Sequence, residues 1–335
     1  MLLISSSSEP RPAELDGAGK CFAKAKEHFF LPCFHCLTVI MPALSLSLFN
    51  SVQVSSLIMQ AIAKDIIIWQ RKITKILMTA QETLPPLSQI DIAPTAALIL
   101  DLQLPKPDGR AVDFTVARGC KNVAIIIIDS LGYDLFMWLL PALENMRDLC
   151  ADGQLLRITA VSNHTTPAIA SILCGLLPEH HEIFDKAGAK ESRIKSLPEI
   201  AAASGQSCAV IMEQNGAEVY QGLIKVVHGI PDSIPPQDFD REACAVTCQA
   251  LREKPRLLVS YFIGIDKSVH LGLGRKGIKE AALLIDRSIG EIVKTANEET
   301  LFIICGDHPI HAGPLKRTRG PYCVAMILAK GKAHK

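Results

Sequence analysis

The sequence has almost no net charge and few aromatic side chains. Its 35 Lys and Arg residues are balanced by 34 Asp and Glu residues among 335 positions, which leaves a formal net charge of +1. No global electrostatic field therefore attracts nucleic acid or an anionic membrane. Aromatic residues form only 5% of the chain, whereas 49% of it is hydrophobic. This composition argues against a disordered chain and favours a core built from aliphatic strands.

The cysteines lack the pattern of a disulfide framework. The chain has 11 Cys, an odd number, and several lie in apolar runs, among them Cys174, Cys208 and Cys305. This distribution indicates buried free thiols in a reducing compartment, so we expect a cytoplasmic protein. Cys33 and Cys36 form a C-x-x-C pair, but no second pair follows at zinc-finger spacing, and we interpret this pair as incidental.

Charge is also missing from residues 29–63, which contain no Asp, Glu, Lys or Arg. A bilayer needs roughly 20 apolar residues, so this stretch is long enough to span one. Pro and Ser residues interrupt it, and the 28 residues before it are too many for an ordinary signal peptide. Two interpretations stay open: a membrane anchor, or translation from upstream of a natural start at Met78. We expect residues 1–77 to be an N-terminal extension and residues 78–335 to be the folded domain.

From residue 122 onward, short apolar runs alternate with helix-like segments. Continuous apolar runs indicate strands that are buried on both faces. Strands that alternate with helices predict a mainly parallel sheet between two helix layers, an α/β fold of the three-layer α/β/α sandwich type. The strand-like runs are 122–129, 207–214, 256–266, 300–307 and 322–330, and the helix-like segments are 141–153, 166–177, 196–205, 240–254 and 277–299.

Three of the expected strands end in a carboxylate, namely Asp129, Asp266 and Asp307. In an open parallel sheet, ligands bind beyond the carboxyl ends of the strands. Each Asp alone is more easily explained as a helix cap or a loop residue. Together they indicate that one edge of the sheet carries a binding site.

Histidines accompany two of these carboxylates. His270 follows Asp266 at i+4, which places both side chains on one face if a helix follows the strand. His308 directly follows Asp307, and His311 lies three residues further on. Taken singly, such histidines are ordinary surface or core residues. As a set with the carboxylates, they form a ligand group that suits Zn²⁺ or Mn²⁺ rather than a soft thiolate site.

A candidate nucleophile precedes one of the expected helices. Thr165 comes directly before Thr166 and Pro167, and Pro is well placed in the first turn of a helix. The positive end of a helix stabilises an alkoxide or a phosphoryl group, although Thr is also a common structural helix cap. Near a metal, its hydroxyl would lose a proton more easily and act as a nucleophile.

Three further residues are candidates for substrate contact. Asn163 and His164 flank Thr165, and Asn215 follows the expected strand 207–214. Polar side chains in such turns often only form hydrogen bonds to the backbone, so a purely structural role stays open as an alternative.

The segments "IIIIDSLGYD", "TTPAIASILCGLLPEHHEI", "GIDKSVHLGLG" and "GDHPIHAG" resemble, in this order, the motifs of the alkaline phosphatase superfamily. The likeness is strongest to its nucleotide pyrophosphatase/phosphodiesterase branch and covers residues 122–313. It implies that Thr165 is the nucleophile. The first of two divalent cations would be bound by Asp129, Thr165, Asp307 and His308, and the second by Asp266, His270 and one further His.

The chain departs from this family pattern at three places. The late His-Gly motif that normally supplies the further His is missing, and we assign His311 in its place. Pro309 stands where the family has Gly, and Glu182 stands where Gly usually follows the His of the "PExHG" motif. These departures affect the loops rather than the carboxylates.

A second resemblance concerns residues 89–112, "QIDIAPTAALILDLQLPKPDGRAV". They are similar to the segment that normally closes the core near the C-terminus of this superfamily. Here the segment precedes the first strand, so we expect a permuted order in which it packs against the sheet from the other end of the chain.

The combined prediction is a metal-dependent phosphoric ester hydrolase that uses Thr165 and two divalent cations, Zn²⁺ or Mn²⁺. Its substrate would be a small phosphodiester or nucleotide pyrophosphate, with no nucleic-acid partner. The alternatives are phosphomutase-type transfer, a non-catalytic binding protein that retains the fold, and a membrane-anchored scaffold. Sulfatase chemistry requires a modified Cys or Ser, which Thr165-Thr166-Pro167 does not supply. The physiological substrate and the oligomeric state stay open.

Overall fold

The computed structural model describes residues 86–313, 315–316 and 320–332. The expectations for residues 1–77, including the uncharged stretch 29–63 and the start at Met78, therefore lie outside the described residues. No helix within the described ranges is both long and apolar enough to cross a membrane.

One sheet of seven strands organises the described part of the chain, in the order β2-β7-β6-β1-β5-β3-β4. The pairs that β1 forms with β5 and β6, and β3 with β4 and β5, are parallel. β7 runs antiparallel to both β2 and β6. The strands are β1 (Asn122–Ile128), β2 (Gln154–Thr159), β3 (Cys208–Glu213), β4 (Val226–Ile230), β5 (Leu257–Phe262), β6 (Thr300–Gly306) and β7 (Cys323–Lys330).

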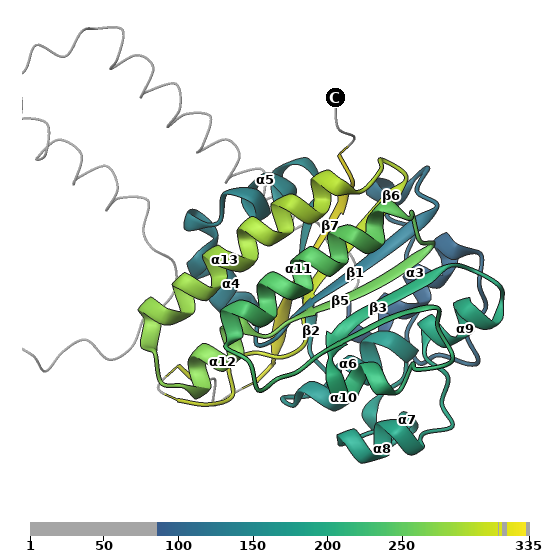
Figure 1. The fold of residues 1–335 in the computed structure, drawn as a ribbon, viewed down its shortest axis with the longest axis horizontal. Coiled ribbons are helices and arrows are strands. Elements are labelled where there is room, and N and C mark those ends of the chain that lie inside the picture. Colours follow the sequence, from purple (N-terminus) through teal and green to yellow (C-terminus); the bar gives the residue numbers. More distant parts are fainter. Residues whose placement is uncertain (1–85, 314, 317–319, 333–335) are drawn as a thin grey trace, which may run out of the picture. The chain divides into compact units, whose positions relative to one another are not determined.

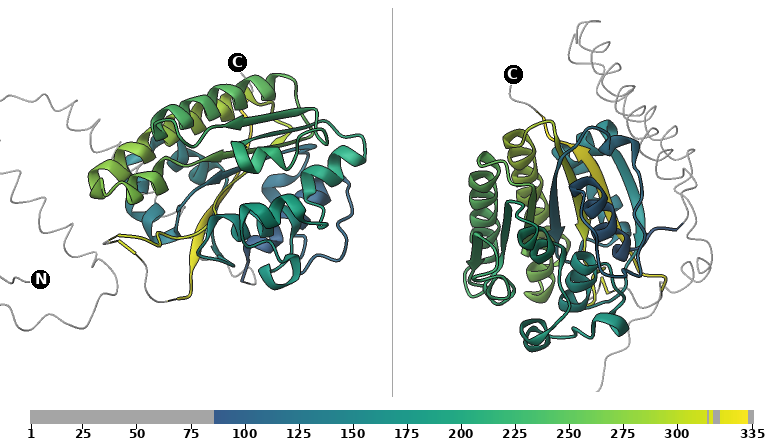
Figure 2. Two further views of the ribbon diagram at one scale, coloured as in Figure 1. Left: turned by 60° about the horizontal axis from the view of Figure 1, so that its bottom comes forward. Right: turned by 90° about the vertical axis from the view of Figure 1, so that its right-hand side faces the viewer.

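Helices cover both faces of this sheet (Figures 1 and 2). α11 and α13 pack against each other and lie with α4, α5 and α12 on one face, while α3, α6 and α9 lie on the other. The predicted three-layer α/β/α class with a mainly parallel sheet is confirmed. The helices are α3 (Ile92–Leu100), α4 (Tyr133–Leu139), α5 (Glu144–Asp152), α6 (Thr165–Cys174), α7 (Pro178–His181), α8 (Lys186–Glu191), α9 (Leu197–Ala203), α10 (Gln214–Glu218), α11 (Pro236–Arg252), α12 (Gly264–His270) and α13 (Gly274–Thr295), with short 3₁₀ turns at Gln89–Asp91, Thr115–Ala117 and Leu140–Ala142.

The five predicted strands are present, each one to five residues shorter than its apolar run. The continuous runs are central strands: every residue of β1, β5 and β6 is buried. β2 and β4 were not predicted. Both are edge strands with partly exposed residues, so neither carries the continuous apolar run by which the central strands were recognised.

The segment 89–112 packs on the sheet as expected. α3 contacts β1, and its apolar residues Ile92, Ala93, Ala96 and Leu100 are buried. Asp91 holds the segment together, because its carboxylate accepts from the backbone N–H of Ser88 at 2.9 Å and of Arg110 at 2.8 Å. This packing does not show whether the order of the segments is permuted relative to the superfamily, so the permutation stays a prediction.

Two predicted boundaries need correction. β5 ends at Phe262, and Asp266 lies in the first turn of α12 rather than at the strand end. The buried carboxylate of Asp240 stabilises the turn between β5 and α12, because it accepts from the N–H groups of Ile263 and Gly264 at 3.0 and 3.2 Å. The apolar run continues past the strand because the start of α12 is itself buried. In α6 the N-cap is His164, and Thr165 is the first helical residue.

Candidate active site

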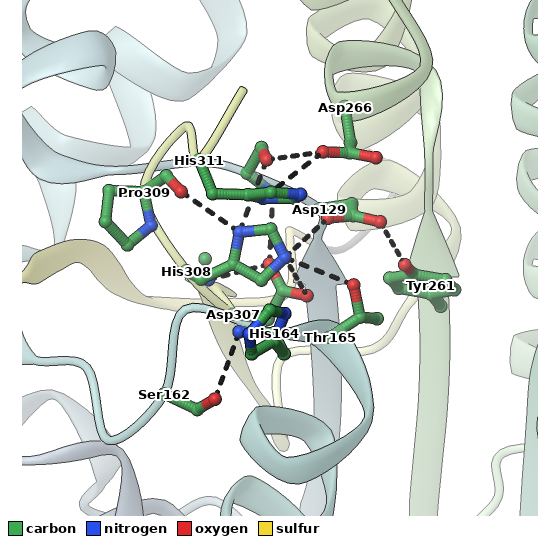
Figure 3. Close-up of polar contacts among 12 residues, drawn as sticks. Asp129, Ser162, His164, Thr165, Tyr261, Asp266, Asp307, His308, Pro309 and His311 are labelled. Atoms are coloured by element: carbon green, nitrogen blue, oxygen red, sulfur yellow. Dashed lines mark hydrogen bonds and ion pairs between the residues drawn. The ribbon is translucent and has the colours of Figure 1, made fainter. Parts of the chain in front are cut away.

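The candidate site lies beyond the carboxyl ends of three adjacent strands. β1 is hydrogen-bonded to β5 on one side and to β6 on the other. Asp129 directly follows β1, Asp307 directly follows β6, and α12 places Asp266 just beyond β5. Figure 3 shows the three carboxylates gathered around His308 and His311.

A first group of ligand atoms consists of Asp129, Asp307 and His308. All three residues are buried, and their ligand atoms lie within 4.8 Å of one another. His308 Nε2 is 3.3 Å from Asp129 Oδ1 and 3.5 Å from Asp307 Oδ2. Thr165 Oγ1 lies 3.1 Å from the same nitrogen (Figure 3). The four residues that the family resemblance assigns to one cation are therefore close together.

The ring of His308 is oriented by its other nitrogen. Nδ1 lies 3.1 Å from the carbonyl oxygen of Pro309 and 3.3 Å from Ser130 Oγ. Because a carbonyl oxygen only accepts, Nδ1 carries the proton, and the lone pair of Nε2 faces Asp129, Asp307 and Thr165. A second hydrogen bond of this kind is the usual way in which a metal-binding His is held. Pro309, a departure from the family pattern, thus still supplies a useful carbonyl.

A second group surrounds Asp266. His270 Nε2 is 3.3 Å from Asp266 Oδ2, and His311 Nδ1 is 4.0 Å from Asp266 Oδ1. The rings of His270 and His311 have centroids 5.1 Å apart, and those of His308 and His311 are 4.8 Å apart. The expected turn into a helix after the strand is confirmed, since Asp266 and His270 both lie in α12.

Several ligand atoms in these groups have no hydrogen-bond partner within the described structure. They are Asp129 Oδ1, Asp307 Oδ2 and His311 Nδ1, and each is buried. A buried carboxylate oxygen without a partner is costly, and coordination to a cation would compensate for the lost hydration. The oxygen and imidazole nitrogen donors suit Zn²⁺ or Mn²⁺. Asp129, Asp307 and His308 therefore fit one divalent cation. Asp266 and His311 also have ligand atoms within 4.8 Å of one another, together with His308 rather than His270.

Burial and mutual repulsion both raise the pKa of the buried carboxyl groups. Burial raises the pKa of Asp129 well above its usual range, and the negative charges of Asp307 and Asp266 add to this increase. Burial also raises the pKa of Asp307 to about 7, although hydrogen bonds from the N–H groups of Ser130 and His308 oppose it. Nearby positive charge would relieve both effects.

Ser130 is a site residue that sequence reasoning missed. Its hydroxyl donates to Asp266 Oδ1 at 2.7 Å, and its N–H donates to Asp307 Oδ1 at 3.0 Å. Its φ of 62° is in the left-handed region, where a non-glycine residue is uncommon and often functional. The available signal was its position directly after Asp129.

Tyr261 and Gln89 were also missed. The hydroxyl of Tyr261 donates to Asp129 Oδ2. The amide of Gln89 donates to the carbonyl oxygens of Gly306 and Asp307, at 2.9 and 2.5 Å, and accepts from the N–H of Val161 at 2.9 Å. Tyr261 lies within a buried strand. Gln89 opens the segment 89–112, which the sequence predicts to pack against the sheet rather than to belong to the site.

The three candidate substrate contacts occupy different positions. His164 is exposed, with its ring centroid 6.2 Å from that of His311. Asn163 has a buried side-chain oxygen without a hydrogen-bond partner in the described structure. Asn215 lies in α10, where both its N–H and its side-chain amide donate to Glu213.

A cavity of about 420 Å³ opens beside the site. Asp129, Thr165 and Asp266 line it, together with Asn215. This volume is in the range of small-molecule sites, and its walls combine apolar side chains with nine charged residues. Of the three candidate substrate contacts, only Asn215 lines this cavity.

Residues 218–328 match the model of the type I phosphodiesterase/nucleotide pyrophosphatase family. The predicted resemblance is thereby confirmed over about a third of the chain. The matched range contains Asp266, His270, Asp307, His308 and His311, whereas Asp129 and Thr165 precede it. No curated protein matches the sequence.

Solved structures with a similar arrangement share little sequence with this chain. Phosphonoacetate hydrolase from Sinorhizobium meliloti 1021 is 14% identical, with 61% of this chain and 59% of that chain covered and a TM-score of 0.48. BT1596, a 2-O GAG sulfatase, is 12% identical, with 63% and 65% covered and a TM-score of 0.49. A Vibrio parahaemolyticus protein in the alkaline phosphatase superfamily is 14% identical, with 79% and 70% covered and a TM-score of 0.47. The chain spans less than two thirds of the length of the first two, and TM-scores below 0.5 carry no argument about activity.

Proposed function

We propose that this chain is a metal-dependent phosphoric ester hydrolase of the phosphodiesterase or nucleotide pyrophosphatase type, with Thr165 as its nucleophile. The observation that carries the proposal is the position of Thr165 Oγ1, 3.1 Å from His308 Nε2. It lies next to buried ligand atoms of Asp129 and Asp307 that lack hydrogen-bond partners among the described residues. The match of residues 218–328 to the phosphodiesterase family supports the same chemistry.

Two divalent cations, Zn²⁺ or Mn²⁺, belong to this proposal. Asp129, Thr165, Asp307 and His308 would hold one, and Asp266, His270 and His311 the other. When bound, such cations lower the pKa of a hydroxyl and neutralise charge that develops on the phosphoryl and leaving oxygens.

In the reaction, Thr165 Oγ loses its proton to solvent water and attacks phosphorus in line with the leaving oxygen. The bond between phosphorus and that oxygen breaks, and the departing alkoxide takes a proton from water. Water then attacks the phosphothreonine, the bond to Oγ breaks, and Thr165 regains its proton. The N-terminus of α6, where Thr165 is the first residue, favours the negative charge that forms at Oγ.

The test combines metal analysis with turnover of bis-p-nitrophenyl phosphate. We expect about two transition metal ions per chain and hydrolysis that is lost in Thr165→Ala and in Asp307→Ala, since effects of several orders of magnitude are typical for nucleophiles. Thr295→Ala is a matched control, because Thr295 lies at the end of α13 and its hydroxyl donates to the carbonyl of Glu291. Equal turnover by wild type and Thr165→Ala would exclude Thr165 as nucleophile. Metal binding without hydrolysis of any phosphate ester would favour the non-catalytic alternative.

A further inference from the structure

The cavity beside Thr165 contains four lysines, and only one of them lacks an acidic partner among the described residues. We propose that this residue, Lys267, recognises a negatively charged group on the ester substituent of the substrate. The inference rests on the proposed hydrolase function and goes beyond it, because it states which charge the substituent carries.

Three of the cavity lysines already form ion pairs with acids at or near the wall. These pairs are Lys186 with Glu213 at 3.3 Å and Asp232 at 3.8 Å, Lys190 with Glu218 at 2.5 Å, and Lys195 with Glu199 at 3.0 Å. Two of these acids also accept hydrogen bonds from other groups. Glu213 accepts from the first N–H groups of α10, and Glu199 accepts from Ser196 at the start of α9. These groups therefore contribute little unbalanced charge to a ligand.

Lys267 differs from them. It follows Asp266 in α12, is half-buried, and lines the same cavity as Thr165 and Asp266. Within the described part of the chain, no carboxylate oxygen lies within 4.0 Å of its ammonium group, so it forms no ion pair with the metal-binding carboxylates. Its positive charge is available to whatever occupies the cavity. A partly buried cation without a partner makes a strong hydrogen bond to an anionic ligand.

The other residues that line the cavity indicate which kind of ester substituent fits it. Apolar atoms form the larger part of the exposed lining surface, and the apolar side chains include Ile169, Leu173, Ile183, Val219 and Leu223. The aromatic residues of the lining are Tyr220 and Tyr261, and the hydroxyl of Tyr261 is already bonded to Asp129. The cavity thus suits an apolar chain or ring that ends in a carboxylate or a phosphate.

The test uses p-nitrophenyl phosphate diesters that differ only in the second substituent: 2-carboxyethyl, 2-phosphoethyl, propyl and 2-aminoethyl. For wild type with its metals, we expect kcat/KM for the two anionic diesters to exceed that for the propyl diester by about tenfold, as for a hydrogen bond to a charged group. The aminoethyl diester should be the poorest substrate. The ratio between the carboxyethyl and phosphoethyl diesters distinguishes the two possible anions.

Variants of two lysines test whether Lys267 causes the preference for anionic diesters. Lys267→Met should reduce the ratio of anionic to propyl diester to about one, and Lys267→Arg should keep most of it. Lys195→Met removes a lysine of the same wall that is paired with Glu199, and it should retain the anionic preference.

Calorimetry supplies a measurement that needs no turnover. Wild type should bind 3-phosphonopropionate about tenfold more tightly than propylphosphonate, and Lys267→Met should bind both equally. Diesters that are all hydrolysed with the same ratios by wild type and Lys267→Met would overturn the inference while leaving the proposed function intact. If no diester is hydrolysed, the proposed function fails, and the phosphonate comparison alone decides the role of Lys267.

Discussion

At the scale of single residues, Gln89 connects the two loops on which the site depends. Its amide joins the carbonyl groups of Gly306 and Asp307, at the end of β6, to the N–H of Val161, which leads into the loop before Thr165. Gln89 is fully buried, so none of these backbone groups can turn to water when the amide is removed. The nucleophile and two of the metal-binding residues thus share one support.

We expect Gln89→Met to lower the free energy of unfolding by about 1–3 kcal/mol, because it leaves buried backbone groups without partners. Urea denaturation measures this loss. Gln206→Met is the matched control, since Gln206 donates only to Leu100 O, at 2.7 Å, from a half-buried position, and it should cost less. If the positioning role is correct, kcat falls in Gln89→Met while KM changes little. A fall in stability without any change in kcat would contradict that role.

Ser130 supports the second metal group in the same way. Removing its hydroxyl leaves Asp266 Oδ1 without the 2.7 Å hydrogen bond that orients it. We expect Ser130→Ala to weaken metal binding by about 10–100-fold, the usual effect of losing such a supporting contact. Metal titration followed by calorimetry measures this change.

Two controls separate this effect from backbone strain. Ser130→Gly removes the hydroxyl but tolerates the φ of 62° and should weaken binding as much as Ala does. Ser268→Ala removes a buried hydroxyl of α12 that donates only to Gly264 O, and metal affinity should stay at the wild-type value. Full affinity in both Ser130 variants would show that Ser130 does not orient Asp266.

At the scale of secondary-structure elements, the turn from β5 into α12 depends on a carboxylate from α11. Asp240 is fully buried and accepts from the N–H groups of Ile263 and Gly264. Position 264 has to be glycine, since a Cβ there would lie 2.2 Å from Asp240 Oδ2. The close approach of α11 and α12 thereby sets the position of α12, which carries Asp266 and His270.

Asp240 should make the stability of the protein depend on pH. Burial raises the pKa of its carboxyl group from 3.8 to about 7 in the folded state, against the effect of its two backbone hydrogen bonds. The folded state then holds the proton more tightly than the unfolded state does. The resulting stabilisation is complete below pH 3.8 and is lost as pH rises through about 7.

Urea denaturation of metal-free protein between pH 4 and 8 measures this dependence. We expect the stability of wild type relative to Asp240→Asn to decrease over that range, by about 1.4 kcal/mol for each unit of pKa difference at most. Asp129 and Asp307 titrate in both proteins, and their contributions cancel in the comparison. Asp238→Asn alters an exposed carboxylate of the same helix and should follow wild type. A constant difference between wild type and Asp240→Asn would refute the assignment.

At the scale of the whole described domain, the parallel centre of the sheet gathers the acidic groups. β5, β1 and β6 are neighbours, so the residues beyond their carboxyl ends meet, although Asp129 and Asp307 are 178 positions apart in the sequence. Gly306 permits the close approach of β6 and the loop after β1, because a Cβ there would lie 2.3 Å from the carbonyl oxygen of Leu131. The described domain therefore concentrates acidic groups in its interior.

This arrangement should make stability depend on bound cations. We expect removal of metal with EDTA to lower the melting temperature and Zn²⁺ or Mn²⁺ to restore it, with about 2.7 kcal/mol of stabilisation at a hundredfold excess over Kd. Differential scanning calorimetry with and without metal measures the change. Asp307→Ala should respond only weakly, while Asp152→Ala, which removes an exposed acid paired with Lys332, should respond like wild type. An unchanged melting temperature in wild type would contradict the metal assignment.

Local patterns by themselves determined the central strands, the alternation with helices, and the identity of the candidate metal and nucleophilic residues. Burial on both faces requires continuous apolar runs, and the residues at the ends of such runs are visible in the chain. Only the tertiary structure decided the edge strands β2 and β4 and the support from Ser130, Tyr261 and Gln89. It also decided that Lys267 has no acidic partner among the residues that the structure describes. These features depend on which distant side chains meet, as Tyr261 and Asp129 do across 132 positions, and on how completely the fold excludes water from them. Neither of these is encoded in the spacing of neighbouring residues.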